Sequence, residues 1–256
     1  MKIGIIGNTV LTYKAVLYFL QQECEVKYVF GLPPHMLRNK VNACDLSKLC
    51  SDNKIAYIDN NEWESISHKK VDVVYELGDS RIVPSSFLQE NTVVGNHGAV
   101  LPFVQGAASL VWGRMLNSGT WGVSLMELNE KIDNGDILIT KEIVYDKNNT
   151  TMKEFVELCD NATIDIVKSH FKGQYKKTNN EGWAVKVAKN TDSKKVVDML
   201  EISLEKGMNI YLPPRRPNDA KISTSWDPSF LEVFKKANHL PYPKYYEGPP
   251  THVCTT

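Results

Sequence analysis

The first half of the chain alternates between short apolar runs and longer segments whose apolar residues have helical spacing. The short runs are rich in β-branched residues and predict strands at 2–6, 25–30, 54–58, 71–77 and 91–96. Helices are predicted over 10–22 and 44–50. Strands that are separated by helices predict a mostly parallel sheet that is covered on both faces.

The second half predicts fewer and longer elements. A helix is expected over 106–117, followed by strands over 121–128 and 136–144. Two further helices are expected over 150–170 and 193–205. Glu154 follows Thr151 by three residues, which is the spacing of a capping box at a helix start. The polar stretch 173–182 is the best linker candidate. We therefore expect an α/β unit over 1–180 and a small C-terminal region over 181–256, rich in Pro and Tyr.

Composition excludes several classes of protein. Hydrophobic residues make up 42% and charged residues 23%, which argues against disorder. Thirty Lys and Arg balance thirty Asp and Glu, which disfavours a dedicated nucleic-acid binder. No apolar run is long enough to cross a bilayer, and the N-terminus lacks signal-peptide anatomy. Five widely spaced Cys without a CxxC pair disfavour a disulfide scaffold or a metal site, so we expect a cytoplasmic protein without metal.

The opening KIGIIGN resembles a dinucleotide-binding turn but lacks its chemistry. Gly4 and Gly7 are its only glycines, so the G-x-G-x-x-G pattern is absent. No acidic residue ends the second predicted strand, where Phe30-Gly31-Leu32 stands. A tight turn from strand to helix is favoured over a phosphate cradle, and this weakens the alternative of a nicotinamide-dependent oxidoreductase.

A stronger signal lies at the end of the strand predicted over 91–96. Asn96 and His97 stand at its carboxyl end, where open α/β sheets bind ligands, and Asp133 follows on a turn that ends at Gly135. A histidine with a carboxylate partner can act as a general base, because the carboxylate stabilises the imidazolium. The Asn96 amide can donate to a developing oxyanion. These groups suit acyl transfer to an amine.

At these residues the sequence resembles the formyltransferases that use 10-formyltetrahydrofolate. Their pattern N-x-H-x-S-L-L-P-x-x-R-G-A, followed by T-G-V-T and L-D-x-G-D-I, is matched at His97, Leu101, Pro102, Gly106, Ala107, TWGV (120–123) and IDNGDI (132–137). The segments LGDSRIVP (77–84) and RRPNDAKIS (215–223) are also similar to the family. The resemblance implies an α/β fold with a Rossmann-like, mostly parallel sheet, the formyltransferase fold, with a small C-terminal appendage. It also implies 10-formyltetrahydrofolate as co-substrate.

The resemblance also implies a set of site residues. The catalytic residues are Asn96, His97 and Asp133, the folate-binding residues are Ser80, Arg81, Ile82, Val83, Ile132 and Gly135, and the substrate-binding residues are Gln105, Arg215 and Arg216. Arg81 could instead be an ordinary surface charge, and the two later arginines could only solvate a Pro-rich segment. Three positions depart from the pattern: Gly95 stands where the family has Asn, Gln105 replaces Arg, and Ala99 replaces Ser. We expect the adjacent Asn96 to serve in place of the usual Asn.

The family's formyl acceptors are methionyl-tRNA, a purine-precursor amine, water and nucleotide-linked amino sugars. The neutral charge and the short segment after the α/β unit favour an amino sugar attached to a nucleotide. Formyl transfer to methionyl-tRNA, or folate or sugar-nucleotide binding without catalysis, stays open. We expect a homodimer joined through the C-terminal third, because an aromatic segment that is too short for its own core needs a surface to cover. Docking on its own chain is the alternative.

Overall fold

One mixed sheet forms the centre of the protein in the computed structural model, which describes residues 1–38, 40–180 and 182–247. Within these residues its strand order is β3-β2-β1-β4-β5-β7-β8. The bounds are Lys2–Ile6 (β1), Glu25–Phe30 (β2), Ala56–Ile58 (β3), Val73–Glu76 (β4), Val93–His97 (β5), Thr120–Glu127 (β7) and Ile137–Val144 (β8). The first five in this order run parallel, and β7 and β8 add an antiparallel edge. The expected α/β, Rossmann-like, mostly parallel sheet is therefore confirmed.

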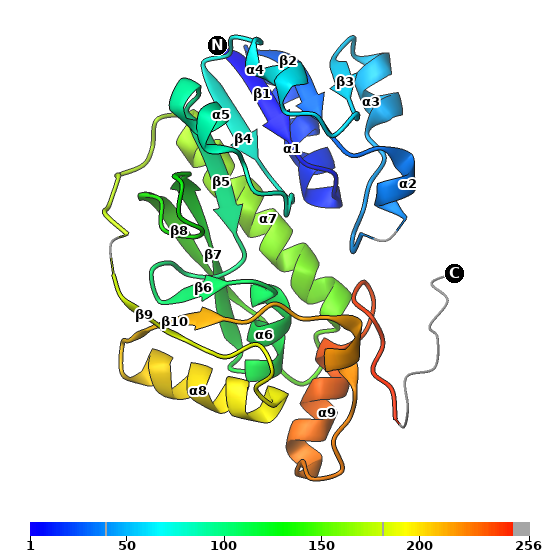
Figure 1. Cartoon of the computed structure of the whole chain (residues 1–256), viewed down its shortest axis with the longest axis vertical. Helices are drawn as coiled ribbons and strands as arrows, with labels where there is room; N and C mark the ends of the chain where they lie inside the picture. The colour runs from blue at the N-terminus through cyan, green and yellow to red at the C-terminus, as the bar shows by residue number, and fades with distance from the viewer. Residues whose placement is uncertain (39, 181, 248–256) are drawn as a thin grey trace.

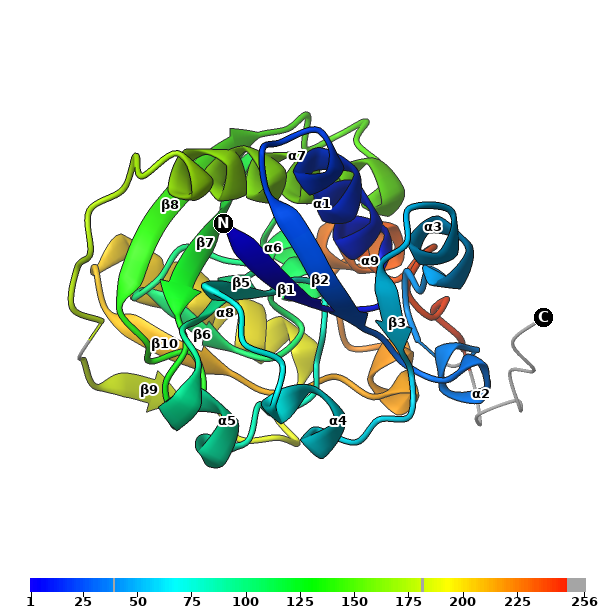
Figure 2. The ribbon, with the colours of Figure 1, turned by 90° about the horizontal axis from the view of Figure 1, so that it is seen from above.

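Helices cover the two faces of this sheet, as Figure 2 shows from above. The helices α1 (Val10–Leu20) and α7 (Met152–Phe171) lie on one face, and α4 (Glu64–Ser67) and α5 (Ser85–Glu90) lie on the other. The short helices α2 (Pro34–Leu37) and α3 (Ser47–Asp52) follow β2. The expected capping box is present, since the Thr151 hydroxyl accepts from Glu154 N at 3.2 Å and Glu154 Oε2 accepts from Thr151 N at 2.8 Å.

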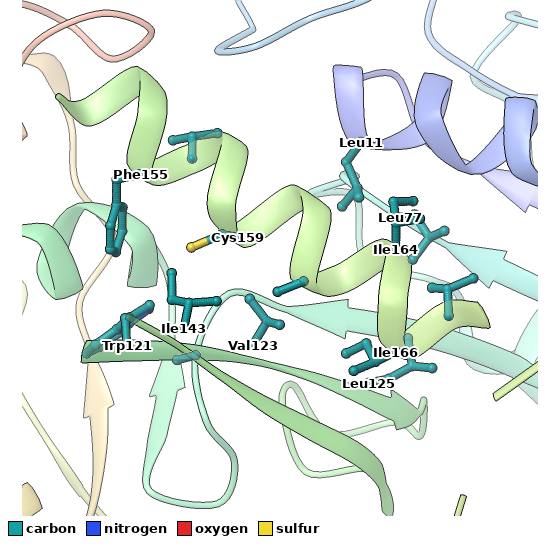
Figure 3. Close-up of a cluster of buried hydrophobic side chains, with 14 of the residues drawn as sticks. Leu11, Leu77, Trp121, Val123, Leu125, Ile143, Phe155, Cys159, Ile164 and Ile166 are labelled. Atoms are coloured by element: carbon teal, nitrogen blue, oxygen red, sulfur yellow. The ribbon is translucent and has the colours of Figure 1, made fainter. Parts of the chain in front are cut away.

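The helix α7 closes the larger core. Phe155 and Cys159 point from it toward the sheet, where Val123 and Leu125 of β7 face the helix (Figure 3). Because side chains alternate along a strand, Ser124 between them faces the opposite side. A smaller apolar cluster lies on that opposite side, made by Ile6, Tyr28, Phe30, Ile66, Val74, Val83, Phe87 and Val93. A strand residue can therefore be assigned to one face of the sheet by the apolar cluster that its side chain belongs to.

A second, three-stranded sheet ties the C-terminal region to the α/β unit. Its order is β6-β10-β9, with bounds Val104–Gly106, Asn209–Leu212 and Ala184–Lys186, and all its pairings are parallel. The helices α6 (Ser109–Leu116) and α8 (Ser193–Glu205) pack on it, and α9 (Pro228–Ala237) packs on α6 (Figure 1). The 3-10 helix η1 (Pro217–Ala220) lies between β10 and α9 in the chain. The middle strand is fully buried at Ile210 and Leu212. The region therefore packs on its own chain as part of the same core.

The helix expected over 106–117 begins later than the sequence predicts. Residues 104–106 form β6, and α6 starts only at Ser109. Gly106 has a φ of 95° and passes so close to Leu212 that a Cβ there would collide with the backbone. The pairing of β6 with β10, a contact between distant parts of the sequence, overrides the local helical pattern.

The aromatic tail is covered by its own chain. Tyr242 and Tyr245 pack against the main core, and Arg215 lies 4.7 Å from the Trp112 ring of α6. The aromatic side chains of this segment therefore find apolar cover on their own chain and do not by themselves require a partner. The homodimer stays a prediction. The expected region 181–256 includes residue 181 and residues 248–256, which lie outside the described residues. Among the described residues, no helix has both the length and the apolar character needed to cross a membrane.

Candidate active site

His97 is the last residue of β5, and its position in the ladder fixes the direction of its side chain. It pairs with Ser124 of β7, while its neighbour Asn96 pairs with Leu125. Directly opposed residues of an antiparallel pair share a face. Because Leu125 faces α7, Asn96 lies on the α7 face and His97 lies on the other. The imidazole is buried, with 6% of the residue exposed.

The structure brings His97 and Asp133 together, as the sequence predicts. His97 Nδ1 lies 3.4 Å from Asp133 Oδ1, and His97 Nε2 lies 3.0 Å from Val104 O. Each ring nitrogen therefore faces an oxygen. A neutral imidazole has one N–H and would turn a lone pair toward one of these oxygens, whereas the imidazolium can donate to both.

The turn that carries Asp133 holds its carboxylate in place. The residue has a φ of 53°, a left-handed conformation that Asp tolerates better than most residues. Its Oδ2 accepts from Gly106 N at 2.7 Å, and its backbone carbonyl accepts from Asn180 Nδ2 at 2.9 Å. The carboxylate is thus anchored on one oxygen while the other oxygen faces His97.

The structure does not bring Asn96 beside His97. Asn96 Oδ1 accepts from Gly78 N at 3.0 Å, across the carboxyl ends of β5 and β4. Consecutive residues of a strand point to opposite faces, so the role of oxyanion donor beside His97 does not fit this position. Gly95, which shares the face of His97, has no side chain to take that role.

A carboxyl group that the sequence analysis did not select lies next to Gly95. Glu76 is its ladder partner on β4, is 8% exposed, and has its Oε2 3.1 Å from where a Cβ on Gly95 would stand. Burial, and then the charge of Asp79, raise the pKa of Glu76 well above its ordinary value. The signal was present in the sequence, since Glu76 is an acid within the apolar run VDVVYEL.

Asp79 is the centre of a buried charge cluster beside Glu76. Its side chain is fully buried, and its Oδ2 accepts from Arg81 Nη2 at 2.7 Å and from Asn8 Nδ2 at 2.8 Å. Lys40 Nζ lies 3.6 Å from its Oδ1. Burial alone would raise the pKa of Asp79, but the hydrogen bonds and charges of Arg81, with the charge of Lys40, lower it below its ordinary value. Asp79 is therefore held as a carboxylate.

The loop expected to bind the folate is organised by this cluster. The Arg81 guanidinium turns inward, 4.3 Å from the Phe30 ring, and its side chain is 13% exposed. The backbone N–H groups of Ser80 and Arg81 both donate to Asp79 Oδ1, at 2.7 and 2.8 Å. Val83 is buried in the smaller cluster, whereas Ile82 is exposed. The arginine thus stabilises the loop, and Ile82 is the loop's outward side chain.

The remaining folate and substrate candidates around Asp133 occupy different environments. Ile132 is exposed beside Asp133. Gly135 passes so close to Glu127 O that any side chain would collide with it, which is a structural need for glycine. Gln105 is buried on β6, with its Nε2 3.5 Å from Pro102 O, so its amide lies inside the protein.

The two expected phosphate-binding arginines differ from each other. Arg215 Nη2 donates to Asp219 O at 2.7 Å and to Asn238 Oδ1 at 2.9 Å, and burial lowers the pKa of Arg215 to about 10. The Arg215 guanidinium therefore binds groups of its own chain rather than a ligand. Arg216 is exposed, and its side chain remains open to a ligand.

The best-defined hollow of the described surface does not lie at His97. A hollow of about 230 Å³ is lined by residues 88–93, Glu127 and Leu128, near the start of β5 rather than at His97. Leu128, which lines this hollow, also borders Gly95. Within the described part of the chain, no three His, Cys, Asp or Glu residues gather as metal ligands would.

Comparisons with known proteins agree with this architecture. No protein-family model matches the chain. The methionyl-tRNA formyltransferase of Desulfotalea psychrophila is 27% identical over 108 residues, which are 41% of this chain and 33% of that protein. The matched stretch thus spans about a third of the length of this relative.

Solved structures match over nearly the whole chain. A sugar N-formyltransferase from a Shewanella species has a TM-score of 0.66 at 15% identity, covering 98% of this chain and 93% of that one. An N-formyltransferase from Helicobacter canadensis, in complex with folinic acid and dTDP-3-aminofucose, has a TM-score of 0.64 at 16% identity, covering 93% and 80%. The protein has the formyltransferase fold, and the resemblance noted in the sequence is confirmed at this level.

Proposed function

We propose that this chain, which has the formyltransferase fold, transfers a formyl group from 10-formyltetrahydrofolate to the amine of a nucleotide-linked amino sugar. The observation that carries the proposal is the pair of His97 and Asp133, 3.4 Å apart at the carboxyl end of β5. A buried imidazole with an anchored carboxylate partner is suited to moving a proton during acyl transfer.

The transfer starts with the free amine of the sugar, whose lone pair attacks the formyl carbon. A carbon–nitrogen bond forms, and the carbonyl electron pair moves onto the formyl oxygen. For this step His97 Nε2 turns from Val104 O to the amine and takes its proton, and Asp133 stabilises the imidazolium at Nδ1. The carbonyl then re-forms, the bond from carbon to the folate nitrogen breaks, and the proton passes to that nitrogen. The products are a formamide on the sugar and tetrahydrofolate. Such proton transfer contributes about a hundredfold or more to the rate.

The folate would lie between the loop at residues 80–83 and the turn around Asp133. Ile82 and Ile132 are large apolar side chains that the structure leaves exposed on these two segments. Apolar surface of this kind suits a flat pterin ring. The Helicobacter canadensis neighbour was crystallised with folinic acid, which supports a formyl-folate as the co-substrate here.

An amino sugar attached to a nucleotide is the acceptor we favour. The Helicobacter canadensis structure contains dTDP-3-aminofucose, and the zero net charge of this chain is poorly matched to a tRNA. Arg216 is an exposed cation that a diphosphate could bind. Formylation of methionyl-tRNA is the second candidate, because the partial sequence matches include methionyl-tRNA formyltransferases.

Release of tetrahydrofolate from 10-formyltetrahydrofolate tests the proposal. The protein would be mixed with dTDP- and UDP-linked amino sugars, and separately with methionyl-tRNA. Turnover with an amino sugar supports the proposal, and turnover with methionyl-tRNA alone favours the second candidate. Folate binding without turnover by any acceptor would indicate a binding protein without catalysis.

We further propose that the protein works in the cytoplasm as a homodimer. The proposal of a dimer rests on the Pro- and Tyr-rich C-terminal third. Leu240, at 69% exposure, is a large apolar side chain there that the described residues leave uncovered. Light scattering at micromolar concentration tests it, and a mass near 28.9 kDa would contradict it.

A further inference from the structure

The sheet face that carries His97 lacks the amide that the N-x-H pattern would place there. The residue two positions before His97 is Gly95, and Asn96 faces the other side of the sheet. An acyl transfer without a donor near the formyl oxygen would forgo a large part of the usual rate enhancement. The question is which group of this chain meets that oxygen.

We infer that the Glu76 carboxyl, in its neutral form, donates a hydrogen bond to the formyl oxygen as that oxygen becomes an oxyanion. The inference rests on the proposed function and names a further catalytic residue for it. The neutral acid would take the place of the missing asparagine amide.

The first support is position. Glu76 and Gly95 are partners in the parallel ladder of β4 and β5, so their side chains share the face of His97. Oε2 of Glu76 lies 3.1 Å from where the Cβ of residue 95 would be. The carboxyl thus enters the space that glycine leaves open, one pleat from the imidazole.

The second support is the hydrogen bonding of the carboxyl. Glu76 Oε1 accepts from Asp79 N at 3.2 Å, which fixes the group by one oxygen. The Leu128 side chain shares the space that glycine leaves, with its Cδ2 2.6 Å from the same Cβ position, and it offers no polar partner. Among the residues that the structure describes, no hydrogen bond is formed by Oε2. One oxygen is therefore anchored and the other remains available to a ligand.

The third support is the charge around the group. Asp79, Lys40 and Arg81 are the charged residues near Glu76. Both cations are directed at Asp79, which is the carboxylate they stabilise. Burial and the negative charge of Asp79 favour the protonated form of Glu76, and they outweigh the two cations and the hydrogen bond from Asp79 N, which favour the ionised form. A buried carboxylic acid that stays neutral can donate a hydrogen bond to an oxyanion, as it does in other enzymes.

The step conserves protons at Glu76. When the amine attacks, the electron pair of the carbonyl moves to oxygen, and the Glu76 O–H shortens its hydrogen bond to that oxygen. The proton stays on Glu76, while His97 receives the proton of the amine. When the carbonyl re-forms, the hydrogen bond weakens and Glu76 is unchanged. An ionised Glu76 would instead repel the oxyanion.

Two substitutions and one matched control test the inference. Glu76→Gln keeps the shape and supplies an amide donor, and Glu76→Leu removes the donor at similar volume. Asp160→Asn is the control, because Asp160 is also a buried carboxyl with a raised pKa but lies on α7, on the other face of the sheet. Melting temperatures and binding of 5-formyltetrahydrofolate would establish that each variant is folded.

We expect kcat of Glu76→Leu to fall about a hundredfold, with KM for the folate nearly unchanged, because the contact is made in the transition state. Glu76→Gln should stay within about tenfold of wild type. As pH rises through the raised pKa of Glu76, the wild type should lose activity, because the donor becomes a carboxylate. Glu76→Gln should lack that alkaline loss, and Asp160→Asn should retain it.

The possible failures are distinguishable. If the wild type transfers the formyl group and Glu76→Leu is equally active, the role of Glu76 is overturned and the proposed function is not. An alkaline loss that persists in Glu76→Gln would also overturn it, even if Glu76→Leu failed to fold. A wild type that releases no tetrahydrofolate with any acceptor would overturn the proposed function, and with it the role inferred for Glu76.

Discussion

Asp133 Oδ1 lies 3.4 Å from His97 Nδ1, and each of the two residues is held from its far side by backbone. Gly106 N donates to the other carboxylate oxygen at 2.7 Å, and Val104 O faces the other ring nitrogen at 3.0 Å. Val104 and Gly106 are the two ends of β6. This short strand therefore positions both members of the pair, and its pairing with β10 connects the site to the C-terminal region.

Replacing His97 should remove transfer and leave the fold. We expect His97→Ala to lower kcat by about a thousandfold or more, because the variant lacks the base that takes the proton of the amine. His239→Ala is the matched control, since His239 is exposed and distant in sequence from the pair. The measurements are tetrahydrofolate release and thermal melting. Near-normal turnover of the folded variant would remove His97 from the mechanism.

Asp133→Asn separates the charge of the carboxylate from its shape. Asn tolerates the left-handed backbone and can still accept from Gly106 N, so the turn should persist. Without the negative charge the imidazolium is less stabilised, and we expect a rate loss of about a hundredfold or more. Asp136→Asn, on the same turn, serves as control. A loss of melting temperature without a loss of rate would make Asp133 a turn residue only.

Asp160 should give the protein a pH-dependent stability that one substitution removes. Burial raises the pKa of Asp160 from 3.8 to about 6, so the folded state binds this proton more tightly than the unfolded chain does. Its contribution is complete below about pH 4 and is lost as pH rises through about 6. A shift of about two units corresponds to about 3 kcal/mol in the free energy of unfolding.

Urea unfolding of wild type and Asp160→Asn at pH 4, 5, 6 and 7 measures this difference. The wild type should lose stability over that range relative to the variant. Glu130→Gln, a change at an exposed acid outside this helix, should follow the wild type closely. Parallel curves for wild type and Asp160→Asn would contradict the assignment.

Arg215 and Arg216 are adjacent but should respond differently to alanine. Arg215→Ala removes hydrogen bonds to Asp219 O and Asn238 Oδ1 and the stacking on Trp112, so we expect a loss of about 2–4 kcal/mol in the free energy of unfolding. Arg216→Ala should leave stability within about 0.5 kcal/mol.

Kinetics would complete that comparison. If Arg216 contacts the diphosphate, its variant should raise KM for the sugar nucleotide several-fold with kcat unchanged, because the contact is equal in ground and transition states. An unchanged KM would remove Arg216 from the substrate site. A stable Arg215→Ala variant with a raised KM would return Arg215 to it.

The elements of the main sheet and the long helices could be predicted from the sequence, and the strands of the smaller sheet could not. The helix over 193–205 and the strands at 2–6 and 25–30 have the bounds expected for them. The strands β6, β9 and β10 have three or four residues each, which is too few to show a period. These strands form because segments that are distant in the sequence pair with each other, and a local sequence pattern carries no information on such pairing.

The site shows the same division. His97 and Asp133 lie within a motif, so their pairing could be predicted. The direction of Asn96 follows from strand alternation, because residues 96 and 97 are consecutive in β5 and so point to opposite faces. The inward turn of Arg81 could not be foreseen, since it depends on Phe30 and Asp79 meeting at the sheet edge.

Transfer of an isotopically labelled formyl group tests the central claim most directly. The protein would be incubated with 10-[¹³C]formyltetrahydrofolate and the dTDP- or UDP-linked amino sugar that gives turnover, and the products would be separated and analysed by NMR and mass spectrometry. The account predicts that the label appears as a formamide on the sugar nitrogen, in equal amount to the tetrahydrofolate released, and that His97→Ala abolishes both. Label found only in free formate, or retained on the folate with every amino sugar, would contradict it.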